Sequence, residues 1–302
     1  MNAPLPIIDG VSPSSQWLPA GHWKTILDFL IERFPKVDNT TWLSRMAKGE
    51  LVDENGHRLN PGTAYRAGAC IFYYRELESE ERIPFDEHIL YQDEHLLVVD
   101  KPHFLPVIPA GRFLHETLLV RLKKKWNLEQ LVPLHRLDRE TAGVVLFSVN
   151  PASRGNYTSL FRNRKIRKVY QALAPAPPSI SFPLTRRSRI VRGEPFFRMT
   201  EIEGSPNSET HIDIVEKAGG STGEAMLYEL TPVTGRKHQL RLHMSALGIP
   251  IVNDRLYPEV SVAQWANSED SFASPIKLLA RSISFEDPLT RREHYFQSSR
   301  SL

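Results

Sequence analysis

Short runs of apolar residues, separated by polar turns, dominate the chain from about residue 88 onward. The runs at 96–99 (Leu-Leu-Val-Val) and 144–147 (Val-Val-Leu-Phe) are typical of strands that are buried on both faces. Tyr170, between Val169 and Gln171, lies on a further expected strand. Only a few segments with helical spacing separate these runs. The pattern therefore predicts an α+β domain built around a mixed sheet.

Helix signals in this domain occur at two places. Asn150 and Pro151 predict a helix start, because Asn caps a helix well and Pro is tolerated at the first helical position. Gly248 and Pro250 form a natural stop for a second helix that ends at Leu247. The segment 174–222 is rich in Pro, Ser and Gly, which predicts strands and exposed loops with a hairpin tip at 219–221.

The first 87 residues follow a different pattern and predict a separate small domain. Residues 1–21 contain four prolines and predict an irregular arm, packed through Ile7, Ile8 and Trp17. Residues 22–76 predict a compact α+β unit, 77–87 a charged linker, and 88–302 the main domain.

Two helices, a hairpin and a closing strand are expected within the compact unit. Apolar residues at helical spacing predict a first helix that ends before Pro35, and a second that carries Trp42 and Met46 and stops at Gly49. An Asn-Gly pair at 55–56 predicts a tight hairpin turn, and the closing strand is expected over 69–74.

Composition limits the classes of protein that fit. The 302 residues are 41% hydrophobic, enough for one large and one small core, and the net charge is only +3. Any affinity for nucleic acid must then come from local basic patches. The single cysteine, Cys70, excludes an internal disulfide and a cysteine-based zinc site, and it fits core packing in the reducing cytoplasm. No apolar run approaches the length of a membrane span, so we expect no membrane partner.

The densest chemistry lies in the turn before the run at 144–147. There Asp138 stands between Arg136 and Arg139 in the sequence His-Arg-Leu-Asp-Arg-Glu-Thr-Ala-Gly. A carboxylate beside arginines keeps a low pKa and stays ionised, which suits a nucleophile or an electrostatic stabiliser. Without its context, such a pair would more often only organise a loop.

The whole string resembles the core motif of the RluA-type pseudouridine synthases. Three further segments resemble motifs of that family in the same order: 93–102 its opening strand and Lys-Pro turn, 165–173 its Lys-x-Tyr segment, and 234–243 its Gly-Arg-x-His-Gln-Leu-Arg-x-His motif. One departure is Asn253, which stands where the family usually has Gly before Asp-x-x-Tyr.

The resemblance implies the pseudouridine synthase fold, a mixed and largely antiparallel sheet with flanking helices and loops. It implies that residues 22–76 are an S4-like RNA-binding domain, although few basic residues remain there, and a mere packing module is the alternative. The implied reaction isomerises uridine in ribosomal or transfer RNA without a cofactor or metal. Asp138 would act at the ribose, Arg241 would grip its carboxylate with two parallel hydrogen bonds, and Tyr170 would stack on the uracil and help remove the proton from carbon 5.

RNA is the expected partner, and the chain is expected to act as a monomer. The residues expected to contact RNA are His135, Arg136, Arg139, Lys168, Arg236, His238 and Gln239. His135 is also expected to fix its loop through a backbone hydrogen bond, and Arg136 to fill the space left by an extruded uridine or to hold the adjacent phosphate. The basic run 162–168 predicts phosphate contacts, and the run 186–192 predicts a mobile RNA clamp in a loop.

Two other hypotheses fit parts of the pattern. The chain could be an RNA-binding or RNA-folding protein that keeps the fold with little catalysis, but such a protein has no need of a carboxylate in a phosphate-attracting groove. His238 and His243 suggest zinc, yet no further ligands stand at suitable spacing.

Overall fold

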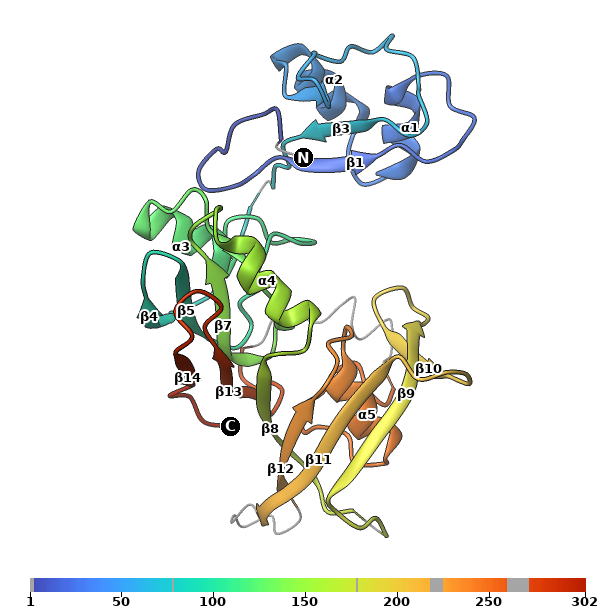
Figure 1. Ribbon diagram of the computed structural model, residues 1–302. Coiled ribbons are helices and arrows are strands. Elements are labelled where there is room, and N and C mark those ends of the chain that lie inside the picture. The colour runs from blue at the N-terminus through green and yellow to red at the C-terminus, as the bar shows by residue number, and fades with distance from the viewer. Residues whose placement is uncertain (1–2, 78, 178, 218–224, 260–271) are drawn as a thin grey trace. The chain divides into compact units, whose positions relative to one another are not determined.

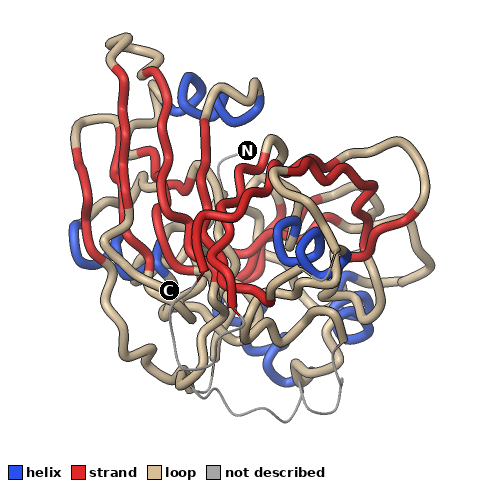
Figure 2. Tube along the Cα trace, turned by 90° about the horizontal axis from the view of Figure 1, so that it is seen from below, coloured by secondary structure: helices blue, strands red, loops and turns tan. Residues whose placement is uncertain are grey.

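The computed structural model describes residues 3–77, 79–177, 179–217, 225–259 and 272–302. Strands predominate over helices in this part of the chain (Figure 2). The chain folds into two compact units. The first comprises Met1–Glu81, Pro109–Glu116 and Val120–Glu129, and the second comprises the remaining segments up to Leu302.

The first unit contains a three-stranded antiparallel sheet in the order β1-β3-β2 and two helices (Figure 1). The helices pack on the sheet through Phe29, Leu30 and Trp42, all fully buried. The expected helices, the turn at Gly56 and the closing strand are confirmed. The elements are β1 (Ser14–Trp17), α1 (Ile26–Arg33), α2 (Asn39–Lys48), β2 (Leu51–Asp53) and β3 (Cys70–Tyr73), and most of α3 (Leu118–Trp126) also belongs to this unit.

The irregular arm expected at residues 1–21 is wrong over part of its length. Residues 14–17 form β1, whose backbone hydrogen bonds are made with β3. The prolines at 13 and 19 flank this edge strand instead of interrupting it. The side chains expected to pack the arm are exposed, with Ile8 at 49% and Trp17 at 56% of their full accessibility.

The charged linker is fixed at one point rather than loose. The Glu80 carboxylate accepts hydrogen bonds from the backbone N–H groups of Leu114, His115 and Glu116 at 2.6, 2.8 and 2.9 Å. Three N–H donors around one carboxylate form a strong anion-binding arrangement, so this part of the linker is held to the segment before α3.

The second unit is built on one large sheet. Its eleven described strands follow the order β10-β9-β11-β12-β8-β13-β7-β5-β4, with β14 paired to β13 and β6 paired to β7. Among the described pairings of this sheet, β13 with β7 is parallel and the others are antiparallel, which confirms the mixed, largely antiparallel α+β architecture. The strands are β4 (His88–Gln92), β5 (Leu96–Lys101), β6 (Val132–Pro133), β7 (Ala142–Ser148), β8 (Arg167–Pro175), β9 (Leu184–Arg192), β10 (Met199–Ile202), β11 (Ser208–Lys217), β12 (Ala225–Pro232), β13 (Leu278–Glu286) and β14 (Glu293–Gln297).

Two helices cover different parts of this sheet (Figure 1). Helix α4 (Arg154–Arg162) packs Tyr157 and Leu160 against β5 and β7, and α5 (Gln239–Ala246) packs Leu240 and Met244 against β11 and β12. The strands expected at 96–99 and 144–147 are β5 and β7, and every residue of both is buried. The loops before β7 and before α5 are therefore both anchored to buried elements.

Two expectations for this unit are corrected by the structure, and a third falls outside the described residues. The Asn150 side chain accepts a hydrogen bond from the Ala152 N–H, as expected of a capping residue, but helix α4 begins only at Arg154, after a turn, and not at Pro151. The basic run 186–192 is not a mobile loop, since it forms part of β9, between β10 and β11. The expected hairpin tip at 219–221 lies outside the described residues.

Gly143 allows β7 and β13 to approach closely, and we expect Gly143→Ala to destabilise the fold by about 3 kcal/mol or more. Its φ is +115°, and an added Cβ would lie 2.2 Å from the carbonyl oxygen of Ala280, which is backbone of the neighbouring strand. Relief of the left-handed φ or of the close contact would require the backbone of one of the two strands to move. Chemical denaturation measures the loss.

Gly155→Ala is the matched control. This glycine lies in the first turn of α4, and no heavy atom lies within 4 Å of an added Cβ. The substitution should therefore raise the free energy of unfolding by about 0.5–1 kcal/mol. Equal free energies of unfolding for the two variants would contradict the role given to Gly143.

Candidate active site

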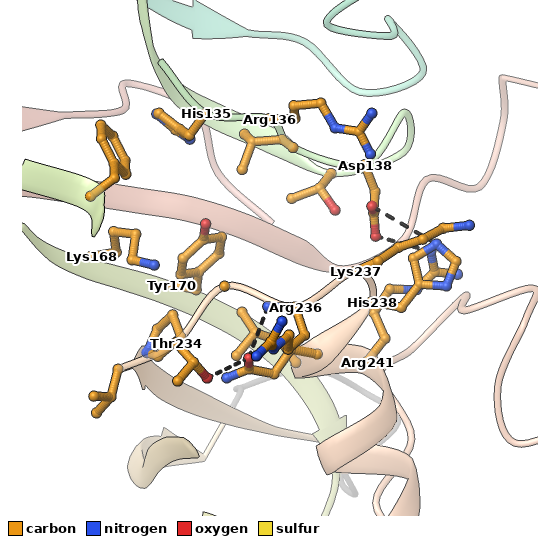
Figure 3. Close-up of a pocket in the computed structure, with 18 of the residues that line it drawn as sticks. His135, Arg136, Asp138, Lys168, Tyr170, Thr234, Arg236, Lys237, His238 and Arg241 are labelled. Atoms are coloured by element: carbon orange, nitrogen blue, oxygen red, sulfur yellow. Dashed lines mark hydrogen bonds and ion pairs between the residues drawn. The ribbon is translucent and has the colours of Figure 1, made fainter. Parts of the chain in front are cut away.

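A pocket of about 620 Å³ opens where three segments of the second unit meet (Figure 3). They are the turn before β7, the stretch from the end of α4 into β8, and the loop between β12 and α5. Of the ten expected site residues, nine line this pocket: His135, Arg136, Asp138, Lys168, Tyr170, Arg236, His238, Gln239 and Arg241. Arg139 is not among the lining residues, because its guanidinium turns to the Glu140 carboxylate at 3.4 Å and to the Phe104 ring.

Hydrogen bonds from Thr141 and Lys101 fix the turn that carries Asp138. Thr141 N–H donates to the Asp138 carbonyl at 3.1 Å, which closes the turn. The fully buried Lys101 ammonium donates to the carbonyls of Arg139, Pro102 and Leu105 at 3.0, 2.9 and 2.7 Å. Burial lowers the pKa of Lys101, but these three carbonyls satisfy all its donors. This role of Lys101 was missed, although the Lys-Pro turn in the sequence is the signal that could have indicated it.

Arg241 connects two carboxylates. Its Nε and Nη2 donate to Asp254 Oδ2 and Oδ1 at 2.7 and 2.6 Å, and its Nη1 donates to Asp138 Oδ2 at 3.3 Å. The expected two parallel hydrogen bonds are therefore made to Asp254, not to Asp138. The Asp254 side chain is only 1% exposed and was missed as a site residue. This arrangement fixes the guanidinium and leaves the Asp138 carboxylate, 31% exposed, open to the pocket.

The turn that contains Asp254 tolerates the loss of the family's usual glycine. Asn253 has φ +63°, the left-handed conformation that Asn adopts more readily than other residues with side chains. Its amide donates to the Pro275 carbonyl at 3.0 Å, and Asp254 in turn accepts from the N–H groups of Leu256 and Tyr257. The departure from the family pattern therefore leaves the carboxylate in place.

The charge of Asp138 is set by its neighbours. Burial would raise the pKa of its carboxyl, but His238 and Arg241 outweigh burial and hold the pKa below its usual range. His238 Nε2 lies 3.9 Å from Asp138 Oδ1, and its Nδ1 is hydrogen-bonded to the Tyr257 hydroxyl at 3.0 Å. Burial lowers the pKa of His238 to about 4, so at neutral pH the permanent positive charge beside Asp138 is that of Arg241.

Tyr170 faces the pocket from β8, between the positions of Asp138 and Lys168 in the view of Figure 3. Burial and the charge of Asp138 raise the pKa of its hydroxyl, which stays protonated at neutral pH. A carboxylate, a guanidinium and a half-buried aromatic ring thus meet in one pocket, as the sequence predicted.

Comparison with known proteins identifies the family. The profile described as RNA pseudouridylate synthase matches residues 95–246, half of the chain, and that segment contains the turn of Asp138, Tyr170 and Arg241. The chain belongs to this family. It is therefore an RNA pseudouridine synthase, an isomerase that acts on RNA.

Individual relatives agree with this assignment. An uncharacterized RNA pseudouridine synthase of Synechocystis is 29% identical over 77% of this chain and 79% of its own length. The dual-specificity RNA pseudouridine synthase RluA of Salmonella typhimurium is 36% identical over 56% of this chain and 76% of its own length. Among solved structures, human RNA pseudouridylate synthase domain containing 1 superposes with a TM-score of 0.56 at 27% identity, covering 74% of this chain and 86% of that one.

Two of the residues expected to contact RNA have roles inside the synthase itself. His135 Nε2 accepts the Leu146 N–H at 3.1 Å, which confirms the expected backbone hydrogen bond. The Gln239 amide oxygen accepts from Thr234 and Arg236, and its nitrogen donates to the Glu209 carbonyl and to Thr210. With its amide fully occupied and only 4% of the residue exposed, Gln239 organises the loop, and these contacts favour that role over an RNA contact.

The lining of the pocket is strongly basic. Its cationic residues are Arg136, Arg162, Arg164, Lys168, Arg236, Lys237 and Arg241, against one acidic residue, Asp138. A concave surface of this charge attracts a phosphate backbone. Along β9, by contrast, Arg186 pairs with Glu201 and Arg187 pairs with Glu209. The net positive charge that the run 186–192 can offer to RNA is therefore smaller than its sequence suggested.

Within the part of the chain that the structure describes, neither histidine of the late motif lies in a metal site. No group of three or more His, Cys, Asp or Glu suited to a metal ion occurs among the described residues. His243 is fully buried, and its ring bonds to the hydroxyls of Ser188, Ser208 and Thr210. Within the described residues, no helix has the length and apolar character needed to cross a membrane.

The ionisation of this site predicts that the rate of the synthase does not change between pH 7 and pH 5. The pKa of Asp138 lies below its usual value and that of His238 lies at about 4, so neither group changes charge as the pH falls from 7 to 5. The single-turnover rate at saturating RNA should therefore stay constant over that range. An inflection near pH 6.5 that disappears in His238→Gln would show that His238 titrates normally and would contradict the geometry.

Proposed function

We propose that this synthase isomerises specific uridines in structured ribosomal or transfer RNA, with Asp138 as the essential group at the ribose. The observation that carries the proposal is an ionised, partly exposed carboxylate, held by Arg241, on the wall of a basic pocket beside Tyr170. The bond between ribose carbon 1′ and uracil nitrogen 1 breaks, the ring rotates, and carbon 5 takes the place of nitrogen 1. Whether the carboxylate attacks carbon 1′ or promotes loss of the 2′ proton, it must be charged.

Arg241 would keep Asp138 oriented, because Asp254 fixes the guanidinium from the far side. Tyr170 would stack on the uracil and help to remove the carbon 5 proton after the new bond has formed. No step needs a metal or cofactor, and we expect a cytoplasmic monomer.

A uridine in folded RNA must leave its stack to reach the pocket, which costs a few kcal/mol. Arg136 lines the pocket beside the Asp138 turn and is the proposed group that fills the vacated space or holds the adjacent phosphate. Arg162, Arg164 and Arg236 supply further phosphate contacts around the same opening.

The proposed role of the first unit is S4-like docking of RNA. Its Lys48, Arg58 and Arg66 are exposed and available for phosphate contacts. Arg45 is not, because it is 5% exposed, stacks on the Trp42 ring and pairs with Glu76 at 3.7 Å. If the unit only packs, changing Lys48, Arg58 and Arg66 to Gln will leave the salt dependence of RNA binding unchanged.

The proposal is tested with RNA from cells that contain and cells that lack the protein. Purified synthase should form pseudouridine, detected by nucleoside analysis, at specific positions of ribosomal or transfer RNA from the deficient cells. The same positions in RNA from normal cells should already be modified. No new pseudouridine in either RNA, despite tight binding, would favour the RNA-binding alternative.

A further inference from the structure

Lys168 and Tyr170 occupy the same face of β8, because alternate residues of a strand point the same way. Both line the pocket, and Tyr170 lies between Lys168 and Asp138 in the view of Figure 3. A uracil stacked on Tyr170 with its ribose at Asp138 would therefore have its far edge directed toward the Lys168 ammonium.

The Lys168 ammonium has no hydrogen-bond or ion-pair partner among the described residues, although the residue is only partly exposed. Every other cation of the pocket lining is exposed except Arg241, and Arg241 pairs with two carboxylates. A Cβ added to Gly235 would lie 3.8 Å from Lys168 Nζ, so the absent side chain leaves space beside the ammonium. Burial without an anion lowers the pKa of Lys168 and costs the fold free energy.

The chemistry requires a cation at such a place. When the bond from carbon 1′ to nitrogen 1 breaks, its electron pair stays on uracil, and the detached ring is an anion. Its charge is shared between nitrogen 1 and the two carbonyl oxygens. This holds for both routes open to Asp138, because each expels the same leaving group. The ring remains an anion until carbon 5 bonds to the ribose, and only then is the carbon 5 proton lost.

We propose that Lys168 is a catalytic residue whose ammonium stabilises the negative charge of the detached uracil. The inference rests on the proposed function in one respect, the placement of the ribose at Asp138. A preorganised cation in a partly desolvated pocket is the kind of group that lowers the barrier where charge develops.

A lysine suits this task better than an arginine. Rotation of the uracil brings carbon 5 to the place of nitrogen 1 and exchanges the two carbonyl oxygens. The ammonium is a compact charge with three rotatable donors, and it can follow either oxygen. A planar guanidinium holds one orientation of a planar anion, so Lys168→Arg should recover only part of the rate.

The test compares Lys168→Met with wild type in single-turnover reactions at saturating RNA. We expect the rate to fall by about 10²–10³-fold, the cost of removing one such donor, with little change in the Kd for RNA. Lys277→Met is the matched control, because it makes the same change at a partly exposed lysine outside the pocket lining. It should leave both the rate at saturation and the Kd for RNA unaltered.

A second substrate separates this role from simple positioning. In RNA with 5-fluorouridine at the target, fluorine stabilises the uracil anion, so the Lys168→Met penalty on cleavage of the bond to nitrogen 1 should shrink. Equal penalties with uridine and 5-fluorouridine, or a full rate in Lys168→Met, would overturn the inference. If wild type forms no pseudouridine from RNA that carries uridine at the target, the proposed function is refuted instead. Thermal unfolding checks the fold, and Lys168→Met should be at least as stable as wild type because a desolvated, unpaired charge is removed.

Discussion

Asp138→Asn is expected to lower the rate of pseudouridine formation by about 10⁴-fold or more, as loss of a residue central to a catalytic unit does. The substitution keeps the shape of the side chain and removes only its charge. Arg241 retains its two hydrogen bonds to Asp254, so the pocket keeps its geometry and the free energy of unfolding should change by no more than about 1 kcal/mol. RNA should bind at least as tightly, because the one acidic residue of the pocket lining is neutralised.

Asp213→Asn is the control for this prediction. Asp213 is an exposed residue of β11 outside the pocket lining, so the same chemical change there should leave both the rate and the Kd unaltered. A tenfold loss or less in Asp138→Asn, with wild-type stability, would mean that the carboxylate is not at the centre of the reaction.

Asp254→Asn should have the largest effect on stability among the residues around the site. The Asp254 side chain is almost fully buried, and the Asn amide keeps one acceptor oxygen but no charge, so the 5% exposed Arg241 side chain is left with one carboxylate, that of Asp138 at 3.3 Å. Breaking a buried ion pair by removing one partner costs about 3–5 kcal/mol. The rate should also fall, by about 10²-fold, because the guanidinium that orients Asp138 is no longer fixed. Denaturant unfolding and single-turnover kinetics measure the two losses.

The exposed pair of Arg291 and Glu286, 3.0 Å apart, provides the comparison. Glu286→Gln should cost less than about 1 kcal/mol, since exposed ion pairs contribute little. If Asp254→Asn is as mild as Glu286→Gln and leaves the rate unchanged, Arg241 does not depend on Asp254.

Sequence patterns predicted the parts of this fold that local composition determines. The apolar runs of β5 and β7 could form little but buried strands, and Gly49 and Gly248 marked the ends of their helices. The four motifs were enough to predict that Asp138, Tyr170 and Arg241 share one site, and all three line the same pocket. Each of these signals lies within a few residues of the feature that it predicts.

The features that were missed depend on distant partners. Residues 14–17 are polar apart from Trp17 and become a strand only because β3 lies beside them. Arg241 contacts Asp254 at 2.7 Å and Asp138 at 3.3 Å, a difference that the sequence does not encode locally. Asp138 lies 103 positions away from Arg241 in the chain. The Lys101 ammonium reaches the Arg139 carbonyl, 38 residues ahead in the chain, and the Lys-Pro turn by itself does not identify that partner.

Release of tritium from RNA labelled at carbon 5 of uridine measures the isomerisation itself. Wild type should release tritium from RNA of cells that lack the protein, and Asp138→Asn should release none. The carbon 5 proton is lost only when carbon 5 has replaced nitrogen 1 at the ribose. Absence of release by wild type from that RNA, while it still binds tightly, would contradict isomerisation of uridine at Asp138.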